Sequence, residues 1–208
     1  MKTPDSIKKF AEVFEKLPGI GPRQAVRLGF HLAQLGEGER AEIAKVVEGL
    51  SSVKICEQCF YVHERDGALC EICSDPARDK SLVAVVEKET DLTSIEGTGK
   101  YKGLYLVLGD LRRRGELEPG QKLRLKALKS RLAKLPASAG SGQAAGKAEE
   151  IIVAVNPTSV GNINAEAIVD ELKDSTKKIT RLGLGIPSGG EIEFADAETL
   201  GAAMERRG

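Results

Sequence analysis

Four cysteines lie in two pairs within a short stretch of the chain, as Cys56-x2-Cys59 and Cys70-x2-Cys73. Each pair fits on a tight turn, and two such turns facing each other can place four sulfurs at the corners of a tetrahedron. This spacing predicts a structural zinc site with one ion per chain. Because four thiolates fill the coordination shell and leave no position for water, we do not expect this zinc to be catalytic.

Other interpretations of the cysteine motif stay open. His63 lies between the two pairs and can replace one cysteine as a ligand. A thioredoxin-like redox site would need one Cys-x-x-Cys pair beside a helix and no second pair. The amino-terminal residues 1–5 lack the apolar stretch of a secretory signal, which predicts a cytoplasmic location. In that reducing compartment, disulfides between these cysteines are not expected to persist.

A second motif, LPGIGPR at residues 17–23, joins two predicted helices by a very tight connection. Glycine permits the backbone angles that such a corner needs. The simpler interpretation is a plain helix–helix turn. The functional interpretation is a helix-hairpin-helix, in which N–H groups at the start of the second helix bind a DNA phosphate without sequence preference. The candidate DNA-binding residues are Gly19, Gly21, Arg23, Arg27 and Lys16.

Two further charged features follow along the chain. Glu87 comes directly after an apolar run, where α/β proteins place their sites, and is either a Mg²⁺ ligand or a hydrogen-bonded strand-end carboxylate. Nine Lys and Arg residues lie between Arg112 and Lys134. They form either the solvated face of an amphipathic helix around leucines that include Leu123, or a second phosphate-binding surface.

Composition limits the classes of protein that this chain can belong to. The 208 residues include 31 Lys and Arg and 31 Asp and Glu, so the formal net charge is zero and bulk positive charge cannot drive binding to nucleic acid. No apolar run approaches the ~20 residues of a membrane-spanning helix. Hydrophobic residues make up 41% of the chain, which fits a globular protein.

Apolar periodicity indicates where the elements lie. Helical spacing predicts three N-terminal helices. In the third, the residues expected to lie inside are Ile43, Val46, Val47 and Leu50. His31 of the second helix is expected to be a packed side chain. Short apolar runs at 82–86, 104–108 and 151–155 predict strands covered on both faces, with a further strand at 178–184. Helices are predicted at 90–97, 121–134 and 163–173.

This alternation predicts an α+β protein of several parts: a helical head, a small four-cysteine zinc finger, and an α/β domain with a mostly parallel sheet. The boundaries that we expect are a head at 1–53, a zinc finger at 54–79, an α/β domain at 80–184, a Pro-, Ala-, Ser- and Gly-rich flexible insertion at 136–146, and a glycine-rich loop and tail at 185–208.

In this order the motifs resemble those of the RecR family of bacterial recombination mediators. The resemblance covers nearly the whole chain. It rests on the LPGIGP corner, the four cysteines, Val85-Val86-Glu87, Tyr101-Lys102-Gly103-Leu104-Tyr105, Asn156-Pro157-Thr158 and the GIPSGG run at 185–190.

The resemblance implies a helix-hairpin-helix head, a zinc finger, a Toprim domain and a tail that helps assembly. It also implies a homo-oligomer, a dimer or tetramer that forms rings around single- or double-stranded DNA. The partners implied are RecO and, in some species, RecF, with which such proteins help to load the RecA recombinase onto single strands. Where the family usually carries acids after Asn-Pro-Thr, this chain has Val160 and Asn162.

Two alternatives to a non-enzymatic, DNA-binding mediator remain. Catalytic Toprim domains hold Mg²⁺ with a Glu and an Asp-x-Asp pair, and here Glu87 is present without the pair, so a nuclease or nucleotidyl-transfer enzyme is one alternative. The other is a zinc-stabilised scaffold that makes no contact with nucleic acid.

Overall fold

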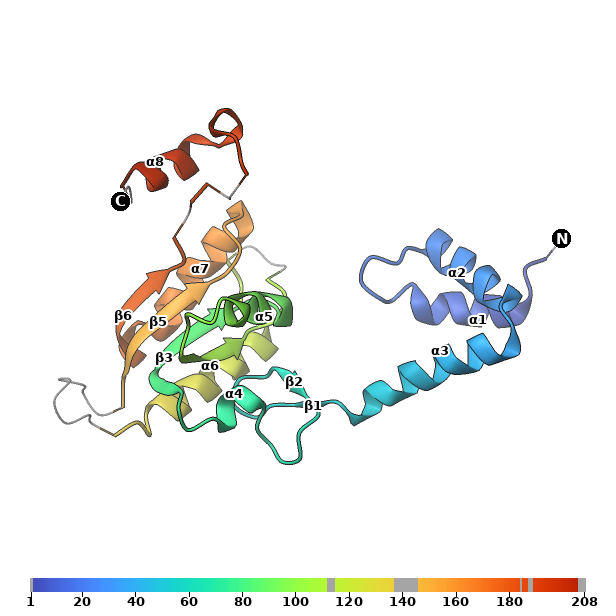
Figure 1. Cartoon of the computed structure of the whole chain (residues 1–208), viewed down its shortest axis with the longest axis horizontal. Helices are drawn as coiled ribbons and strands as arrows, with labels where there is room; N and C mark the ends of the chain where they lie inside the picture. The colour runs from blue at the N-terminus through green and yellow to red at the C-terminus, as the bar shows by residue number, and fades with distance from the viewer. Residues whose placement is uncertain (1, 112–114, 137–145, 184, 187–188, 206–208) are drawn as a thin grey trace. The chain divides into compact units, whose positions relative to one another are not determined.

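A computed structural model describes residues 2–111, 115–136, 146–183, 185–186 and 189–205. The chain divides into two compact units, Met1–Val53 and Lys54–Gly208, and each is described by itself (Figure 1). We call the first unit the head. Most of the predicted insertion at 136–146 lies outside the described residues, and so do residues 112–114 of the predicted basic stretch.

The head is helical throughout. Its elements are α1 (Asp5–Phe14), α2 (Pro22–Gln34), α3 (Glu37–Gly49) and the short 3₁₀ helix η1 (Leu50–Ser52). Ile7 and Ala11 are the buried residues of α1, and Ala25 and Gly29 are those of α2. Gly29 lets the two helices approach closely, because a Cβ at this position would lie only 3.1 Å from the side chains of Ile7 and Phe10.

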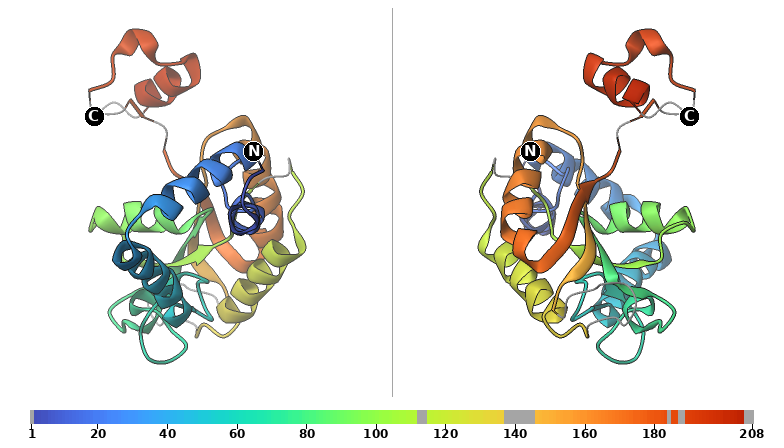
Figure 2. Two further views of the ribbon diagram at one scale, coloured as in Figure 1. Left: turned by 90° about the vertical axis from the view of Figure 1, so that its right-hand side faces the viewer. Right: turned by 90° about the vertical axis from the view of Figure 1, so that its left-hand side faces the viewer.

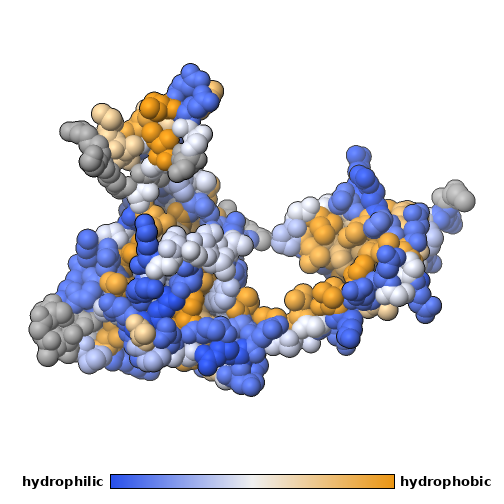
Figure 3. All heavy atoms as spheres, in the orientation of Figure 1, coloured by the Kyte–Doolittle hydropathy of each residue, from blue (hydrophilic) through white to orange (hydrophobic). Residues whose placement is uncertain are grey.

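The apolar face of the third helix differs from the prediction. Ile43, Val46 and Val47 of α3 and Leu50 of η1 are exposed rather than inside, with Val46 at 66% and Leu50 at 65% of full exposure. A unit of about 50 residues has too little chain to cover a third apolar face. His31 on α2 is also exposed rather than packed. Apolar side chains therefore gather on the surface of the head, as Figure 3 shows.

The second unit begins with a small hairpin that carries the first cysteine pair. Strand β1 (Lys54–Ile55) pairs antiparallel with β2 (Val62–His63), with Lys54 opposite His63. The one-turn helix α4 (Glu71–Ser74) follows and carries the second pair. We call this part, residues 54–78, the cysteine module.

A four-stranded parallel sheet forms the centre of the α/β domain, in the order β4-β3-β5-β6. Its strands are β3 (Asp79–Val86), β4 (Gly103–Val107), β5 (Ala148–Ala154) and β6 (Thr176–Arg181). β3 begins three residues before the predicted strand, and its register against β4 shifts between Asp79 and Val83. The helices between the strands are α5 (Glu89–Gly97), α6 (Pro119–Leu132) and α7 (Ser159–Leu172), and η2 (Lys173–Ser175) precedes β6. The predicted α+β fold with a parallel sheet is confirmed.

The sheet is covered on both faces, as its apolar strands predict (Figure 2). One face packs against α6 and α7, with Leu128 and Ile168 fully buried. The other packs against α5 through Leu92, together with Tyr61 and Ile72 of the cysteine module. Leu123 of α6 is an exception to the predicted apolar face, since it is 66% exposed.

The C-terminal segment holds η3 (Ile192–Phe194) and α8 (Ala197–Glu205). α8 has no buried residue, and Phe194 is 79% exposed. Over the part of the chain that the structure describes, no helix has the length and apolar character needed to cross a bilayer.

Candidate metal and nucleic-acid sites

The four cysteines form one buried cluster. Cys56 and Cys59 lie on the turn that links β1 and β2, and Cys70 and Cys73 lie at the start of α4 and within it. Their sulfurs all lie within 4.8 Å of one another, and the Cys59 and Cys70 sulfurs are 3.5 Å apart. All four are free thiols. Four buried soft ligands brought this close can hold a metal ion such as Zn²⁺.

Local backbone bonds shape the first cysteine turn. The Phe60 N–H donates to the Cys56 carbonyl at 3.0 Å, and the Cys56 N–H donates to the Tyr61 carbonyl at 2.8 Å. Phe60 takes a positive φ of 62°, which brings the chain back toward the first cysteine. Hydrogen bonds from the neighbouring thiols, that of Cys59 first, lower the pKa of Cys56. Hydrogen bonds with Cys56 raise the pKa of Cys59 and of Cys73 instead, so the four thiols do not ionise alike before a metal binds.

His63 stands apart from the cluster. It is buried, and neither ring nitrogen has a hydrogen-bond partner among the described residues. The only group of potential ligand atoms that gathers in this described part of the chain consists of the four cysteines. The structure therefore does not place His63 among the potential metal ligands, where it could replace a cysteine.

The cysteine module is fixed to the α/β domain through the first cysteine turn. The Val107 N–H, on the edge strand β4, donates to the Cys59 carbonyl at 2.8 Å. From α6, Arg131 donates to the Gln58 carbonyl at 3.3 Å. The Arg124 guanidinium lies 5.1 Å from the centre of the Phe60 ring and donates to the Val107 carbonyl at 2.9 Å.

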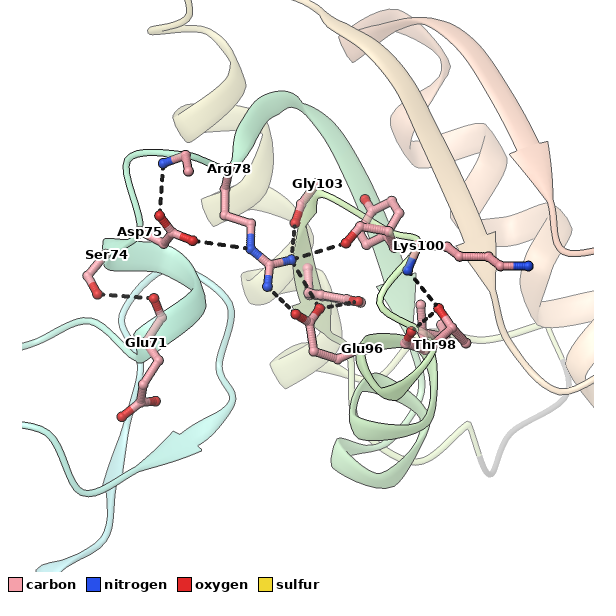
Figure 4. A network of polar contacts seen from close by, with 12 residues as sticks. Glu71, Ser74, Asp75, Arg78, Glu96, Thr98, Lys100 and Gly103 are labelled. Carbon is pink, nitrogen blue, oxygen red and sulfur yellow. Dashed lines mark hydrogen bonds and ion pairs between the residues drawn. The ribbon is translucent and has the colours of Figure 1, made fainter.

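A second attachment runs through Arg78, after the second cysteine pair (Figure 4). Its guanidinium forms an ion pair with Glu96 of α5, lies 3.7 Å from an Asp75 carboxylate oxygen, and donates to the Tyr101 and Gly103 carbonyls. The hydrogen bond from Arg78 holds the pKa of Glu96 below its ordinary value, and the Arg78 charge adds to that effect. The Tyr105 hydroxyl donates to the same carboxylate at 2.8 Å, and burial raises the pKa of that tyrosine.

The predicted DNA-binding residues lie on the turn between α1 and α2 and in the first turns of α2. We call this segment, residues 16–27, the glycine corner. Gly19 has a φ of +78°, which side-chain-bearing residues rarely adopt, and Gly21 is the N-cap of α2. Apart from the two chain neighbours, no heavy atom of the described residues lies within 4 Å of the Cβ position at either glycine, so the corner is open. Arg23 and Arg27 stand one turn apart at the start of α2, and Lys16 is the first residue of the corner.

The three cations at this corner have no ion-pair partner among the residues that the structure describes. Lys16, Arg23 and Arg27 are all exposed. The first turn of a helix such as α2 also leaves backbone N–H groups without intrahelical acceptors. Unpaired cations beside free N–H groups are suited to an anionic ligand.

The basic residues on α6 differ from those of the head because several of them already bind other groups of the protein. Fewer cations are therefore left for the second phosphate-binding surface that the sequence suggested. Arg124 and Arg131 donate to backbone carbonyls of the protein itself, and Lys129 forms an ion pair with Glu171 at 2.6 Å. Sequence reasoning missed these uses, since nothing in the local sequence marks which cations meet distant carbonyls. The remaining described cations of the stretch, Lys122, Lys126 and Lys134, are exposed.

Glu87 lies at the carboxyl end of β3 as predicted, and its carboxylate is hydrogen-bonded. One oxygen accepts from the Leu111 N–H at 3.1 Å, and the other accepts from the Asn156 side-chain amide at 3.2 Å. Lys88 approaches it at 4.0 Å. Of the two interpretations of Glu87, this geometry favours the hydrogen-bonded strand-end carboxylate.

Comparison with known proteins agrees with this arrangement. A family model described as Toprim domain matches residues 81–183, and one described as RecR, C-terminal, matches residues 185–207. The chain is 39% identical to the recombination protein RecR of Thermus thermophilus, over 100% of this chain and 98% of the relative. It is 36% identical to RecR of an Anaeromyxobacter species, with the same coverage, and 34% identical to RecR of Gloeobacter violaceus, over 97% and 96%. The resemblance inferred from the motifs is thus confirmed, and the chain belongs to the RecR family of recombination proteins.

Proposed function

We propose that this protein is a DNA-binding recombination mediator whose head holds DNA phosphates without sequence preference. The observation that carries the proposal is the open glycine corner with three exposed cations, Lys16, Arg23 and Arg27, that pair with no described carboxylate. Groups of this kind contact the phosphate backbone of single- or double-stranded DNA rather than base edges. The recombination role that relatives carry in their name supports this placement.

In this proposal the cysteine cluster holds one structural zinc ion. Cys56, Cys59, Cys70 and Cys73 are its four ligands, and their burial and separation of at most 4.8 Å support that assignment. A bound zinc would supply folding free energy to a short segment that buries little apolar surface.

Assembly and partners belong to the same proposal. The exposed apolar side chains of α3 and of the C-terminal segment support a homo-oligomer, a ring-forming dimer or tetramer, because contiguous exposed apolar surface marks interaction sites. We further propose that the protein works in the cytoplasm with RecO, and with RecF where that protein takes part, to help load RecA onto single strands.

The proposed role is not enzymatic. The Glu87 carboxylate already accepts two hydrogen bonds, and Asn156 stands opposite it where a Mg²⁺ site would need another acid. The competing proposal is a Mg²⁺-dependent nuclease or nucleotidyl-transfer enzyme. Cleavage or nucleotide transfer by the pure protein, abolished by Glu87→Gln, would establish it.

The test of DNA binding is a titration of a fluorescent single-stranded oligonucleotide, and of its duplex, over a range of about 50 to 200 mM salt. Replacing Arg23 and Arg27 together by glutamine should weaken binding to every sequence alike and lower the slope of log K against log salt by about two. An unchanged slope would remove these residues from the DNA site.

The matched control is the pair Lys122→Gln and Lys126→Gln, which removes two exposed cations from α6 of the α/β domain. Net charge changes equally in the two double variants, so an effect of overall charge would appear in both. The proposal expects the control to change the slope by much less. No binding by the wild-type protein even at low salt would leave only the zinc-stabilised scaffold.

A further inference from the structure

Arg131 is a partly buried cation that the nucleic-acid proposal leaves unused. It lies near the end of α6, beside Leu128 and Leu132 of the apolar core. One guanidinium nitrogen, Nη1, donates to the Gln58 carbonyl at 3.3 Å. The other, Nη2, is shielded from solvent and has no hydrogen-bond partner among the described residues. A charged nitrogen that is shielded from water and lacks an acceptor, as Nη2 is, is costly unless a negative charge lies nearby.

The cysteine cluster is the source of that negative charge. Gln58 lies between Cys56 and Cys59, so the bond from Arg131 reaches directly into the first cysteine turn. Four thiolates around one Zn²⁺ leave a net charge of minus two on a site that is itself buried. Burial lowers the pKa of Arg131, and the charges of Cys73, Cys59 and Cys56 oppose that shift, which means that the guanidinium lies within electrostatic reach of the sulfurs.

We propose that Arg131 is the counter-charge of the metal-bound cysteine cluster and thereby a residue that sets its affinity for zinc. This inference rests on the zinc site of the proposed function. Arg131 is not one of the four ligands. It acts through the ligands, as the outer partners of metal ligands generally do. Arg131 lies on α6. The α/β domain therefore contributes a charged residue to a metal site whose four ligands all belong to the cysteine module.

The same placement of Arg131 also makes the stability of the α/β domain depend on the metal. When zinc leaves, the turn that carries the Gln58 carbonyl loses the ion that holds it, while Arg131 stays on a helix of the core. An enclosed, unpaired cation destabilises the fold around it. Zinc loading should therefore stabilise α6 and its surroundings as well as the cysteine module.

The experiment measures zinc affinity of the full chain by competition with a chromophoric chelator. Arg131→Gln should bind zinc about 10- to 100-fold more weakly than the wild type, the usual effect of losing an outer partner of a metal ligand. Arg131→Lys keeps the charge while losing the planar guanidinium, and its affinity should stay within about threefold of the wild type.

Arg124→Gln is the matched control. Arg124 lies on the same helix, contacts Phe60 of the same cysteine turn, and also donates to a backbone carbonyl, but that carbonyl belongs to Val107 of β4 and not to the segment between Cys56 and Cys59. Its loss should leave zinc affinity within about threefold of the wild type. An equal loss of affinity in Arg124→Gln and Arg131→Gln would show that docking of the turn, rather than charge, matters, and would overturn the proposal.

The remaining outcomes separate this inference from the zinc site itself. A wild-type chain that takes up no zinc removes the metal site of the proposed function. Tight binding by the wild type with unchanged affinity in Arg131→Gln removes only the role of Arg131. If Arg131→Gln does not fold, Arg131→Lys decides: retained affinity supports the counter-charge, and a loss of about tenfold or more contradicts it.

Discussion

The head and helix α6 are both rich in basic residues, yet they use those residues in opposite ways. At the glycine corner of the head, Arg23 and Arg27 are exposed and pair with no described residue. On α6, Arg124 and Arg131 reach backbone carbonyls near the cysteine module and help to attach it. Lys and Arg density alone therefore does not indicate a nucleic-acid surface. What distinguishes one is whether the protein already supplies acceptors for the cations.

Apolar residues show the same contrast. Leu128 of α6 and Val46 of α3 both occupy helical apolar stripes, but Leu128 is fully buried and Val46 is 66% exposed. The α/β domain has a sheet with helices on both faces, whereas the described residues of the head form three α-helices and one short 3₁₀ helix without a sheet. The described residues of the head therefore leave this apolar stripe exposed.

Metal removal should produce the largest difference between regions. Stripping zinc with a chelator should abolish protection of the cysteine module from hydrogen exchange, because metal binding contributes about 10–16 kcal/mol in zinc-finger peptides. The sheet should stay folded with reduced protection, and the head should not change. Identical exchange with and without the chelator would mean that the cysteine cluster folds without metal.

Truncation of one apolar side chain in each region tests the contrast in packing. Leu128→Ala should lower the free energy of unfolding by about 2–5 kcal/mol, because it leaves a cavity in the core. Val46→Ala should change stability by less than about 0.5 kcal/mol at protein concentrations where the chain is monomeric. Chemical denaturation measures both. Similar losses would show that the face of α3 is covered within the chain.

The glycine corner itself can be strained with one methyl group. Gly19→Ala forces a side chain into a φ of +78° and should cost about 1–2 kcal/mol in the head. DNA affinity should fall with it, because the N–H groups of the corner shift. Gly38→Ala is the control, since Gly38 lies inside α3, where alanine is the better helix former. A corner that tolerates alanine at position 19 with full DNA affinity would contradict the geometry proposed for the site.

The smallest expected effect concerns the pH dependence of the second attachment. Arg78 lowers the folded-state pKa of Glu96, so this pair stabilises the fold above the ordinary glutamate pKa. That stability is lost as pH falls through the lowered pKa. Glu96→Gln should remove this dependence and cost at most about 1 kcal/mol near neutral pH. Thermal unfolding between about pH 3 and 7 measures it. If the unfolding temperature of Glu96→Gln falls toward acid pH as steeply as that of the wild type, the pH dependence belongs to other carboxylates.

Local patterns in the sequence were sufficient to predict most of the fold. The spacing of the cysteines, the apolar strands and the glycine corner each depend on residues close together in the chain, and the structure has these elements where they were expected. The exposure of Val46 and His31 was not predictable in this way, because it depends on which elements lack a neighbour. The bond from Arg131 to Gln58 spans 73 positions, and no local signal marks it.

Binding of DNA at the glycine corner can be seen directly in a hydrogen-exchange footprint of the full chain at low salt, with and without a single-stranded oligonucleotide. The account predicts that added DNA slows exchange in peptides covering residues 16–27 and leaves peptides covering 119–132 of α6 unchanged. Protection on α6 without protection at the glycine corner would contradict it. DNA would then bind the helix whose arginines already donate to backbone carbonyls, and not the exposed cations of the head.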